Sequence, residues 1–193
     1  MCTTNADTST GFLLRNYVSS WEPSTGCTVW QAARATSAAP TFFPPIRFGT
    51  PAQNWVDGGL RHNNPVRALY DEARRIWPTQ SGRKIGCIIS IGAGDPPLHA
   101  VGKRGKDLLQ ALVKISTDTK QTAREFRNET EHLPPADGFK YFRLNAGPAV
   151  AAIGLEEWKV FDRLTGATND YLNDSKNVMD DCAACLGGLA SES

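Results

Sequence analysis

The stretch Trp55-Val56-Asp57-Gly58-Gly59 predicts a short strand that ends in a carboxylate and a glycine turn. Aromatic and β-branched residues favour the strand, and the two glycines let other backbone approach closely while the carboxylate stays accessible. Ligands of open α/β sheets bind beyond the carboxyl ends of the strands, so Asp57 is a candidate catalytic residue. The alternative is a structural turn in which the Asp57 carboxylate only accepts hydrogen bonds from nearby backbone amides.

Strands and helices alternate on both sides of this stretch. Prolines and glycines separate the apolar segments, and residues 84–92 form the nearly continuous apolar run that is typical of a strand buried in a parallel sheet. The alternation predicts an α/β fold with a largely parallel sheet. The expected elements are a strand at 12–18, a helix at 28–38, an irregular connection at 41–51, a loop at 60–64, a helix at 66–76, a strand at 84–92, a helix around 108–126, a strand at 139–144 and a helix at 155–172.

The composition of the chain narrows the class of protein. Its 193 residues, 40% of them hydrophobic, suit one globular domain or a large piece of one. Lys and Arg total 21 against 20 Asp and Glu, so no strong field favours nucleic acid, and we expect no nucleic-acid partner. Neither a secretion signal nor an apolar stretch of about 20 residues is evident, so we expect a soluble cytoplasmic protein.

Several ordered motifs carry a resemblance to a known family. Residues 31–43 (QAARATSAAPTFF), the Asp57-Gly58-Gly59 motif and Asn63-Asn64-Pro65 resemble the patatin-like phospholipases, particularly those of fungi. The similarity continues downstream, so the best-matching core is about 12–172. The resemblance implies a single, partial patatin-like domain over residues 1–193, with a three-layer αβα architecture and a mostly parallel central sheet.

The resemblance also implies a chemistry. Patatin-like enzymes hydrolyse acyl esters of phospholipids and neutral lipids with a serine–aspartate dyad that needs no metal or cofactor. The serine attacks the ester carbonyl, the aspartate acts as its base, and a glycine-rich loop donates amides to the oxyanion. By motif match, Asp57 takes the role of this aspartate. A lipid or phospholipid ester is the expected substrate, with peripheral contact to a membrane.

The sequence departs from the family pattern at the nucleophile. The family's glycine-rich oxyanion loop and Gly-x-Ser-x-Gly elbow precede the region that this chain resembles, and neither occurs upstream of Gln31. We therefore expect an N-terminally truncated hydrolase domain that is inactive by itself. The alternative is a non-catalytic module of the same fold that binds lipid or a protein partner.

Ser9 is a second candidate, as the nucleophile. Asp7-Thr8-Ser9-Thr10-Gly11 imitates part of the serine elbow, but Asp7 occupies the first glycine position and strand-forming residues follow where a helix is required. A polar loop before the strand at 12–18 is the favoured interpretation.

A third candidate is the turn Ser90-Ile91-Gly92-Ala93-Gly94-Asp95, which follows a predicted buried strand and could hold a phosphate. The rest of a dinucleotide-binding motif is missing, and Pro96-Pro97 prevents a helix from starting directly. A loop at the sheet edge near the active site is the favoured interpretation.

The remaining chemical groups are expected to be structural or solvated. His62 is expected in a loop. Arg34 is expected in a structural salt bridge, and a contact with phosphate is the alternative. His99 and His132 lie in polar stretches. The cysteines are five scattered residues, Cys2, Cys27, Cys87, Cys182 and Cys185, and their odd number predicts reduced thiols. Cys182-Ala-Ala-Cys185 has the spacing of redox or zinc pairs but is expected to be an ordinary pair on a helix face.

Overall fold

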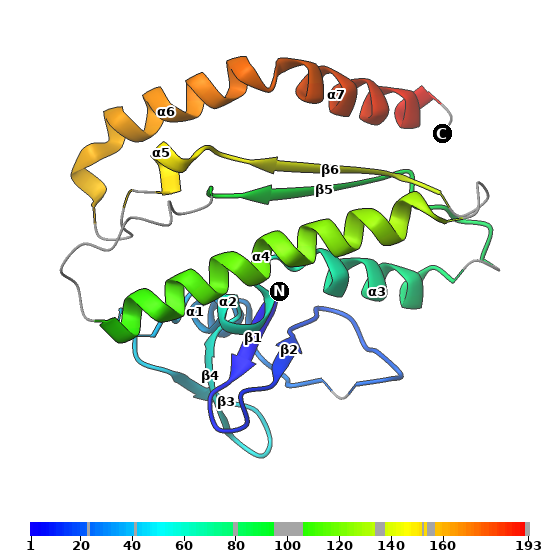
Figure 1. The fold of residues 1–193 in the computed structure, drawn as a ribbon. Coiled ribbons are helices and arrows are strands. Elements are labelled where there is room, and N and C mark those ends of the chain that lie inside the picture. The colour runs from blue at the N-terminus through cyan, green and yellow to red at the C-terminus, as the bar shows by residue number, and fades with distance from the viewer. Residues whose placement is uncertain are drawn as a thin grey trace. The chain divides into compact units, whose positions relative to one another are not determined.

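The computed structural model describes residues 1–22, 24–40, 42–78, 81–94, 106–133, 138–151, 153 and 157–191. They form two compact units, Met1–Pro65 and Val66–Ser193 (Figure 1). The expectation of a single domain over the whole chain stays a prediction.

The first unit is built on a four-stranded antiparallel sheet. Its strand order is β2-β1-β4-β3, which places β1 and β4 at the centre. Helix α1 packs against β1, β3 and β4, and the short α2 lies against β1 and β2. The elements are β1 (Cys2–Asn5), β2 (Gly11–Leu13), α1 (Val29–Thr36), β3 (Ile46–Phe48), β4 (Gln53–Asp57) and α2 (Gly59–His62).

The core of this unit surrounds Trp55, which is 2% exposed. Its ring stacks on Phe48 at 5.6 Å and lies tilted against Phe12 at 5.2 Å, and its Nε1–H donates to the Phe48 carbonyl. Helix α1 reaches this cluster with Ala32 and Ala35. The small side chains allow the helix to approach the sheet closely, and burial of a tryptophan contributes about 3 kcal/mol or more.

The second unit has a sheet between two layers of helices (Figure 1). Strands β5 (Cys87–Gly92) and β6 (Lys140–Asn145) pair in parallel. One face packs against α3 (Val66–Ile76) and α4 (Lys106–Glu131), and α6 (Phe161–Asp174) and α7 (Lys176–Ser191) lie over the other. The connection from β6 to α6 includes α5 (Pro148–Ala151) and the 3-10 turn η2 (Trp158–Val160).

Aromatic side chains join α3 and α4 to the parallel sheet. Phe126 of α4 is 1% exposed and meets Tyr70 and Tyr141 edge to face, at 5.6 Å and 4.9 Å between ring centroids. Ile88 and Val66 complete the buried cluster. Edge-to-face pairs are worth about 1 kcal/mol each beyond the apolar area that they bury, so this cluster fixes both helices on the sheet.

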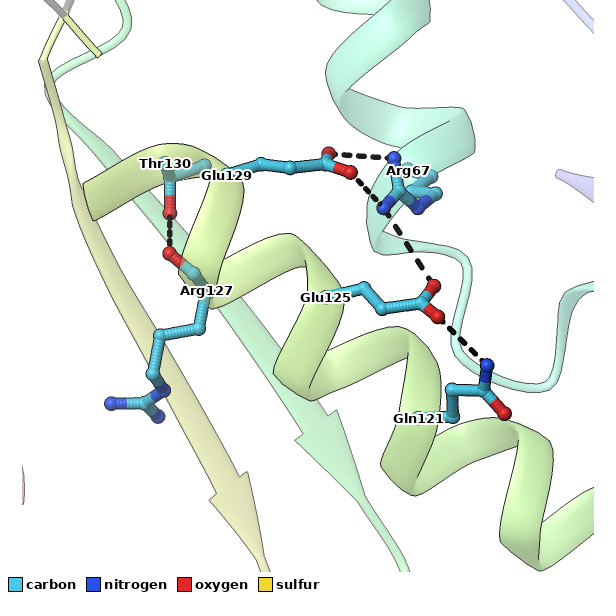
Figure 2. Close-up of polar contacts among 6 residues, drawn as sticks. All are labelled: Arg67, Gln121, Glu125, Arg127, Glu129 and Thr130. Carbon is cyan, nitrogen blue, oxygen red and sulfur yellow. Dashed lines mark hydrogen bonds and ion pairs between the residues drawn. The ribbon is translucent and has the colours of Figure 1, made fainter. Parts of the chain in front are cut away.

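An ion pair joins α3 to α4 at the surface (Figure 2). Arg67 donates to both carboxylate oxygens of Glu129, at 2.7 Å and 2.6 Å, in a bidentate geometry. Glu125 lies 3.9 Å from the same guanidinium and accepts a hydrogen bond from Gln121. The hydrogen bond from Arg67 lowers the pKa of Glu129 below its ordinary value.

The α/β class predicted from the sequence is confirmed. Helix α3 spans the predicted 66–76, and β5 and β6 form the expected parallel pairing. Strand β5 begins three residues after the start of the predicted strand at 84–92, and β6 is shifted by one residue from the predicted 139–144. Helix α4 exceeds its predicted range at both ends. The sheet of the first unit is antiparallel instead, because β1 and β2 form a hairpin and β4 returns beside β1.

The structure differs from the expectations in four further places. Strand β2 ends at Leu13, opposite Cys2, although Leu14 and Met1 continue the pairing with hydrogen bonds of 2.7 Å and 2.8 Å. The connection at 41–51 contains β3, and the loop at 60–64 is mostly helix α2. The last predicted helix begins at Phe161, after η2, and α7 follows it.

Candidate active site

Asp57 is the last residue of β4, at the centre of the antiparallel sheet. It lies opposite Thr3 of β1, and its backbone N–H donates to the Ala38 carbonyl at 3.0 Å. Thr3 is fully buried and donates its hydroxyl to the Val56 carbonyl at 2.7 Å. The backbone that carries the half-buried Asp57 is therefore held on both sides.

The two oxygens of the Asp57 carboxylate differ in their partners. Oδ1 accepts a hydrogen bond from the Gly59 N–H at 2.7 Å, which starts helix α2. Oδ2 has no hydrogen-bond partner among the residues that the structure describes. The expected backbone turn is present, and it leaves one oxygen able to accept a proton.

Gly58 is required by a close approach of backbone. Its φ of −66° is open to any residue, but a Cβ atom at this position would lie 2.3 Å from the carbonyl oxygen of Cys2. The adjacent Gly59 is less confined, since its nearest neighbour would be Asp57 Oδ1 at 3.1 Å. The motif therefore contains glycine at 58 because β1 passes directly beside it.

Two motifs that are separate in the sequence meet at this site. The C-terminal end of α1 and the following residues lie beside the start of β1 and the end of β4, since the Thr36 hydroxyl donates to the Cys2 carbonyl at 2.6 Å. Ala38 is fully buried and bonded to Asp57. The alanine-rich stretch at 31–43 thus provides the packing surface on which the Asp57 strand ends.

His62 lies over the hairpin strand β2. A Cβ atom at Gly11 would come within 2.4 Å of His62 Nε2, so the ring occupies the space above that glycine. Burial, with a smaller contribution from the positive charge of Arg61, lowers the pKa of His62 below 6.5. His62 is therefore neutral at pH 7, and it is in α2 instead of the predicted loop.

Ser9 lies in the turn between β1 and β2. Asn5 Oδ1 accepts hydrogen bonds from the N–H groups of Asp7 and Thr8, and Ser9 is exposed with a φ of 55°. A strand follows this turn, whereas a nucleophile elbow requires a helix. Asn5 pairs with Trp55, so the turn extends from the end of β1 opposite to the end that pairs with Asp57.

Arg34 is held by a backbone carbonyl and an aromatic ring instead of the expected salt bridge. Its Nη2 donates to the Pro44 carbonyl at 2.7 Å, and its guanidinium lies 5.4 Å from the centre of the Phe43 ring. Within the described residues it forms no ion pair, and its Nη1 is buried without a hydrogen bond. Arg34 therefore joins α1 to the proline-rich segment after it.

In the second unit, the turn after β5 is surrounded by polar groups that the sequence did not identify. Arg143 Nη1 donates to the Ser90 hydroxyl at 2.8 Å, and its Nη2 donates to Asn145 Oδ1 at 3.3 Å. The same Asn145 oxygen accepts from the Gly94 N–H at 3.1 Å. The pairing of Ser90 with Arg143 depends on the register of β5 and β6, which the sequence does not reveal.

Asp95 and His99 fall outside the described residues, and His132 is exposed. The proximity of the Ser90 turn to Asp57 stays a prediction. All five cysteines are free thiols, and no group of three or more His, Cys, Asp or Glu residues in the described part of the chain could hold a metal ion. Among the helices that the structure describes, none combines the length and apolar character needed to cross a membrane.

Comparison with known proteins finds similarity to one family over part of the chain. Residues 3–70 match the family model of patatin, described as patatin-like phospholipase, and this match contains the whole site around Asp57. The chain is 29% identical over 154 residues to phospholipase A I of Arabidopsis thaliana, covering 78% of this chain and 11% of that protein. It is 35% identical over 121 residues to calcium-independent phospholipase A2-gamma of Rattus norvegicus, covering 61% and 14%.

A third relative is named as an inactive protein. Probable inactive patatin-like protein 9 of Arabidopsis thaliana is 33% identical over 123 residues, covering 58% of this chain and 32% of that protein. The chain therefore spans less than a third of the length of each of these three relatives.

Proposed function

We propose that this chain, whose residues 3–70 carry a patatin-like phospholipase segment, supplies the aspartate of a serine–aspartate lipid acyl hydrolase. The observation that carries the proposal is the Asp57 carboxylate, fixed at the end of a central strand with one oxygen bonded to Gly59 and the other available. Phospholipid esters are the proposed substrate class, in keeping with the names of the two phospholipase relatives.

Asp57 Oδ2 is the proposed proton acceptor for a serine hydroxyl. Loss of the proton lets the serine oxygen attack the ester carbonyl carbon, and collapse of the tetrahedral intermediate returns the proton to the departing alcohol. Water then releases the fatty acid by the same steps. The bond from the Gly59 N–H holds the carboxylate in one orientation, which reduces the reorganisation that proton transfer would otherwise require.

The serine itself comes from outside these 193 residues in this proposal. The sequence contains no Gly-x-Ser-x-Gly segment, and Ser9 lies in a hairpin turn without the elbow geometry. Cys2 is a poor substitute although its backbone borders Gly58, because burial raises the pKa of its thiol. The chain by itself is therefore proposed to be inactive.

Two measurements test the proposal. The purified chain should release no fatty acid from a fluorogenic phospholipid and should not react with a fluorophosphonate, which labels activated serines. The transcript should then be sequenced upstream of Met1 for an in-frame glycine-rich loop and a serine elbow. If both are encoded, the longer protein should hydrolyse phospholipid, and Asp57→Asn should lower kcat by about 10²–10⁴-fold.

Hydrolysis by the 193-residue chain that Asp57→Asn abolishes would overturn the claim that the serine lies elsewhere. Full activity of Asp57→Asn in the longer protein would overturn the role of Asp57. A mutation of Asp7 to Asn gives a matched control, because it removes an exposed carboxylate of the same unit that lies in the hairpin turn.

A non-catalytic lipid-binding module is the second candidate. It is favoured by the exposure of large apolar side chains on α1 and after it, where Val29 is 87% exposed, Trp30 64% and Phe43 55%. Such side chains insert readily into the interface of a bilayer. Co-sedimentation with phosphatidylcholine vesicles, lost in Trp30→Ser, without any hydrolysis by the longest encoded protein, would support this candidate over the hydrolase.

A further inference from the structure

Helix α7 presents two cysteines to the parallel sheet of the second unit. Along the helix, the residues Met179, Cys182 and Cys185 are less exposed than their neighbours, and Cys182 is only 6% exposed. Their spacing of three residues places them on one face of the helix. Because α7 packs on β6, this face is directed towards the sheet (Figure 1).

A third thiol lies beneath this helix face. Cys87 begins β5 and pairs with Lys140, the first residue of β6, so it lies at the edge where both strands start. Burial, with a smaller contribution from the neighbouring Cys185 thiol, raises the pKa of Cys87 to about 11. Cys182 contributes less to the same shift, and Lys140 opposes it.

We propose that Cys87 and Cys185 are a covalent modification site, at which a disulfide links strand β5 to helix α7 under oxidising conditions. The two half-buried residues come from different layers of the unit. Ile88, the residue after Cys87, is buried in the cluster with α3 and α4, so Cys87 is directed to the opposite face of β5, the face that α7 covers. The inference concerns the second unit alone and does not depend on the proposed function.

The chemistry requires a low-molecular-weight disulfide as oxidant, for which glutathione disulfide serves. One cysteine of the pair loses its proton and attacks a sulfur of glutathione disulfide, which forms a mixed disulfide and releases one glutathione. The second cysteine, once deprotonated, attacks the cysteine sulfur of that mixed disulfide and releases the second glutathione. Two thiols are oxidised by two electrons, and two glutathione molecules carry away the electrons and the protons.

The high pKa of Cys87 sets the conditions for this exchange. Thiolates attack disulfides and thiols do not, so Cys87 reacts slowly near neutral pH and faster as the pH rises towards 11. The bond would close a loop of roughly 100 residues, which restricts the unfolded chain more than a short loop does. In the folded chain the same bond joins α7 to β5 covalently, so oxidation should fasten α7 on the sheet.

Peptide mapping of the purified 193-residue chain tests the site. After incubation with glutathione disulfide and alkylation of the remaining thiols, trypsin should release peptide 85–103 bonded to peptide 177–193, at the summed mass less two hydrogens and with Cys182 alkylated. Peptide 177–193 contains both Cys182 and Cys185, so Cys182→Ser should keep the cross-link and Cys185→Ser should remove it.

The wild-type chain decides the question even if a variant folds poorly. Absence of the cross-linked peptide, or a bond confined to peptide 177–193, overturns the proposal, and so does a cross-link that persists in Cys185→Ser. Hydrogen exchange gives a second readout: amides of α7 should exchange at least several-fold more slowly in the oxidised wild type than in the reduced one, with no difference in Cys87→Ser. Equal exchange in both redox states would overturn the claim that the bond fastens α7.

Discussion

The Asp57 carboxylate and the Gly59 backbone N–H are joined by a hydrogen bond of 2.7 Å. This bond uses Oδ1 to hold the turn, and it leaves Oδ2 without a partner among the described residues. A structural turn and a catalytic base are the two alternatives that the sequence leaves open for Asp57. At Asp57 the two are compatible, because the bond to Gly59 occupies one oxygen and leaves the other for the proposed role as base.

Asp57→Asn and Asp57→Ala should show how much the hydrogen bond to Gly59 contributes to stability. Asparagine keeps an Oδ1 acceptor for the Gly59 N–H, so the free energy of unfolding should change by less than about 1 kcal/mol. Alanine removes the acceptor and should lower it by about 1–3 kcal/mol. Urea denaturation of both variants provides the measurement, and equal stability of the two would show that the bond does not hold the turn.

Gly58→Ala should destabilise the first unit. The added Cβ would meet the Cys2 carbonyl at 2.3 Å, and that backbone is fixed by the pairing of β1 with β4. Overpacking of this kind costs about 1–3 kcal/mol, which denaturant unfolding would detect. Gly166→Ala is the matched control, because its Cβ would enter open space in helix α6, and a stability change as large as that of Gly58→Ala would contradict the steric account.

The sequence predicts elements well where hydrophobic periodicity dominates. Helix α3 follows the spacing of Val66 and the apolar residues after it, and β5 follows the apolar run at 84–92. Strand β1 was not predicted, because Thr3 and Thr4 read as polar although both are buried, at 0% and 2% exposure. Their burial depends on partners distant in the sequence, such as the Val56 carbonyl that accepts from Thr3.

In the candidate site, too, only the features with a local sequence signal could be predicted. Asp57 at a strand end followed by a glycine turn could be predicted, because strand formers and glycines signal it locally. The reason for glycine at 58 could not, since it depends on how closely β1 passes. Arg143 and Asn145 were also missed, because only the register of β5 and β6 brings them to Ser90 and Gly94.

His62 should make folding of the first unit sensitive to mild acid. Its pKa is lowered in the folded protein, so below pH 6.5 the unfolded chain binds a proton that the folded chain does not. The stability of the wild type relative to His62→Gln should therefore be constant above pH 6.5 and should fall as the pH drops through the folded pKa. Urea denaturation from pH 8 to 5 would show it, whereas parallel profiles would contradict a lowered pKa.

The Arg67–Glu129 pair should also lose its stabilising effect in acid, in the second unit and at lower pH (Figure 2). The pKa of Glu129 is lowered below 4.5 by the hydrogen bond from Arg67, so the folded chain releases this proton more readily than the unfolded chain. The resulting stability is present above pH 4.5 and is lost as the pH falls through the folded pKa. Both side chains are largely exposed, which limits the contribution to about 1 kcal/mol or less.

Glu129→Gln should accordingly lower the free energy of unfolding at pH 7 and have little effect near pH 3, as measured by urea denaturation. High salt should reduce the effect at pH 7, since the pair is screened. Glu131→Gln is the control: it removes a charge from the same end of α4 but from a side chain without an ion pair among the described residues. Of the two glutamates changed, Glu129 contacts Arg67 and Glu131 does not. Equal losses in both variants at pH 7 would therefore assign the effect to the net charge of the helix, and the bidentate contact would then contribute nothing measurable.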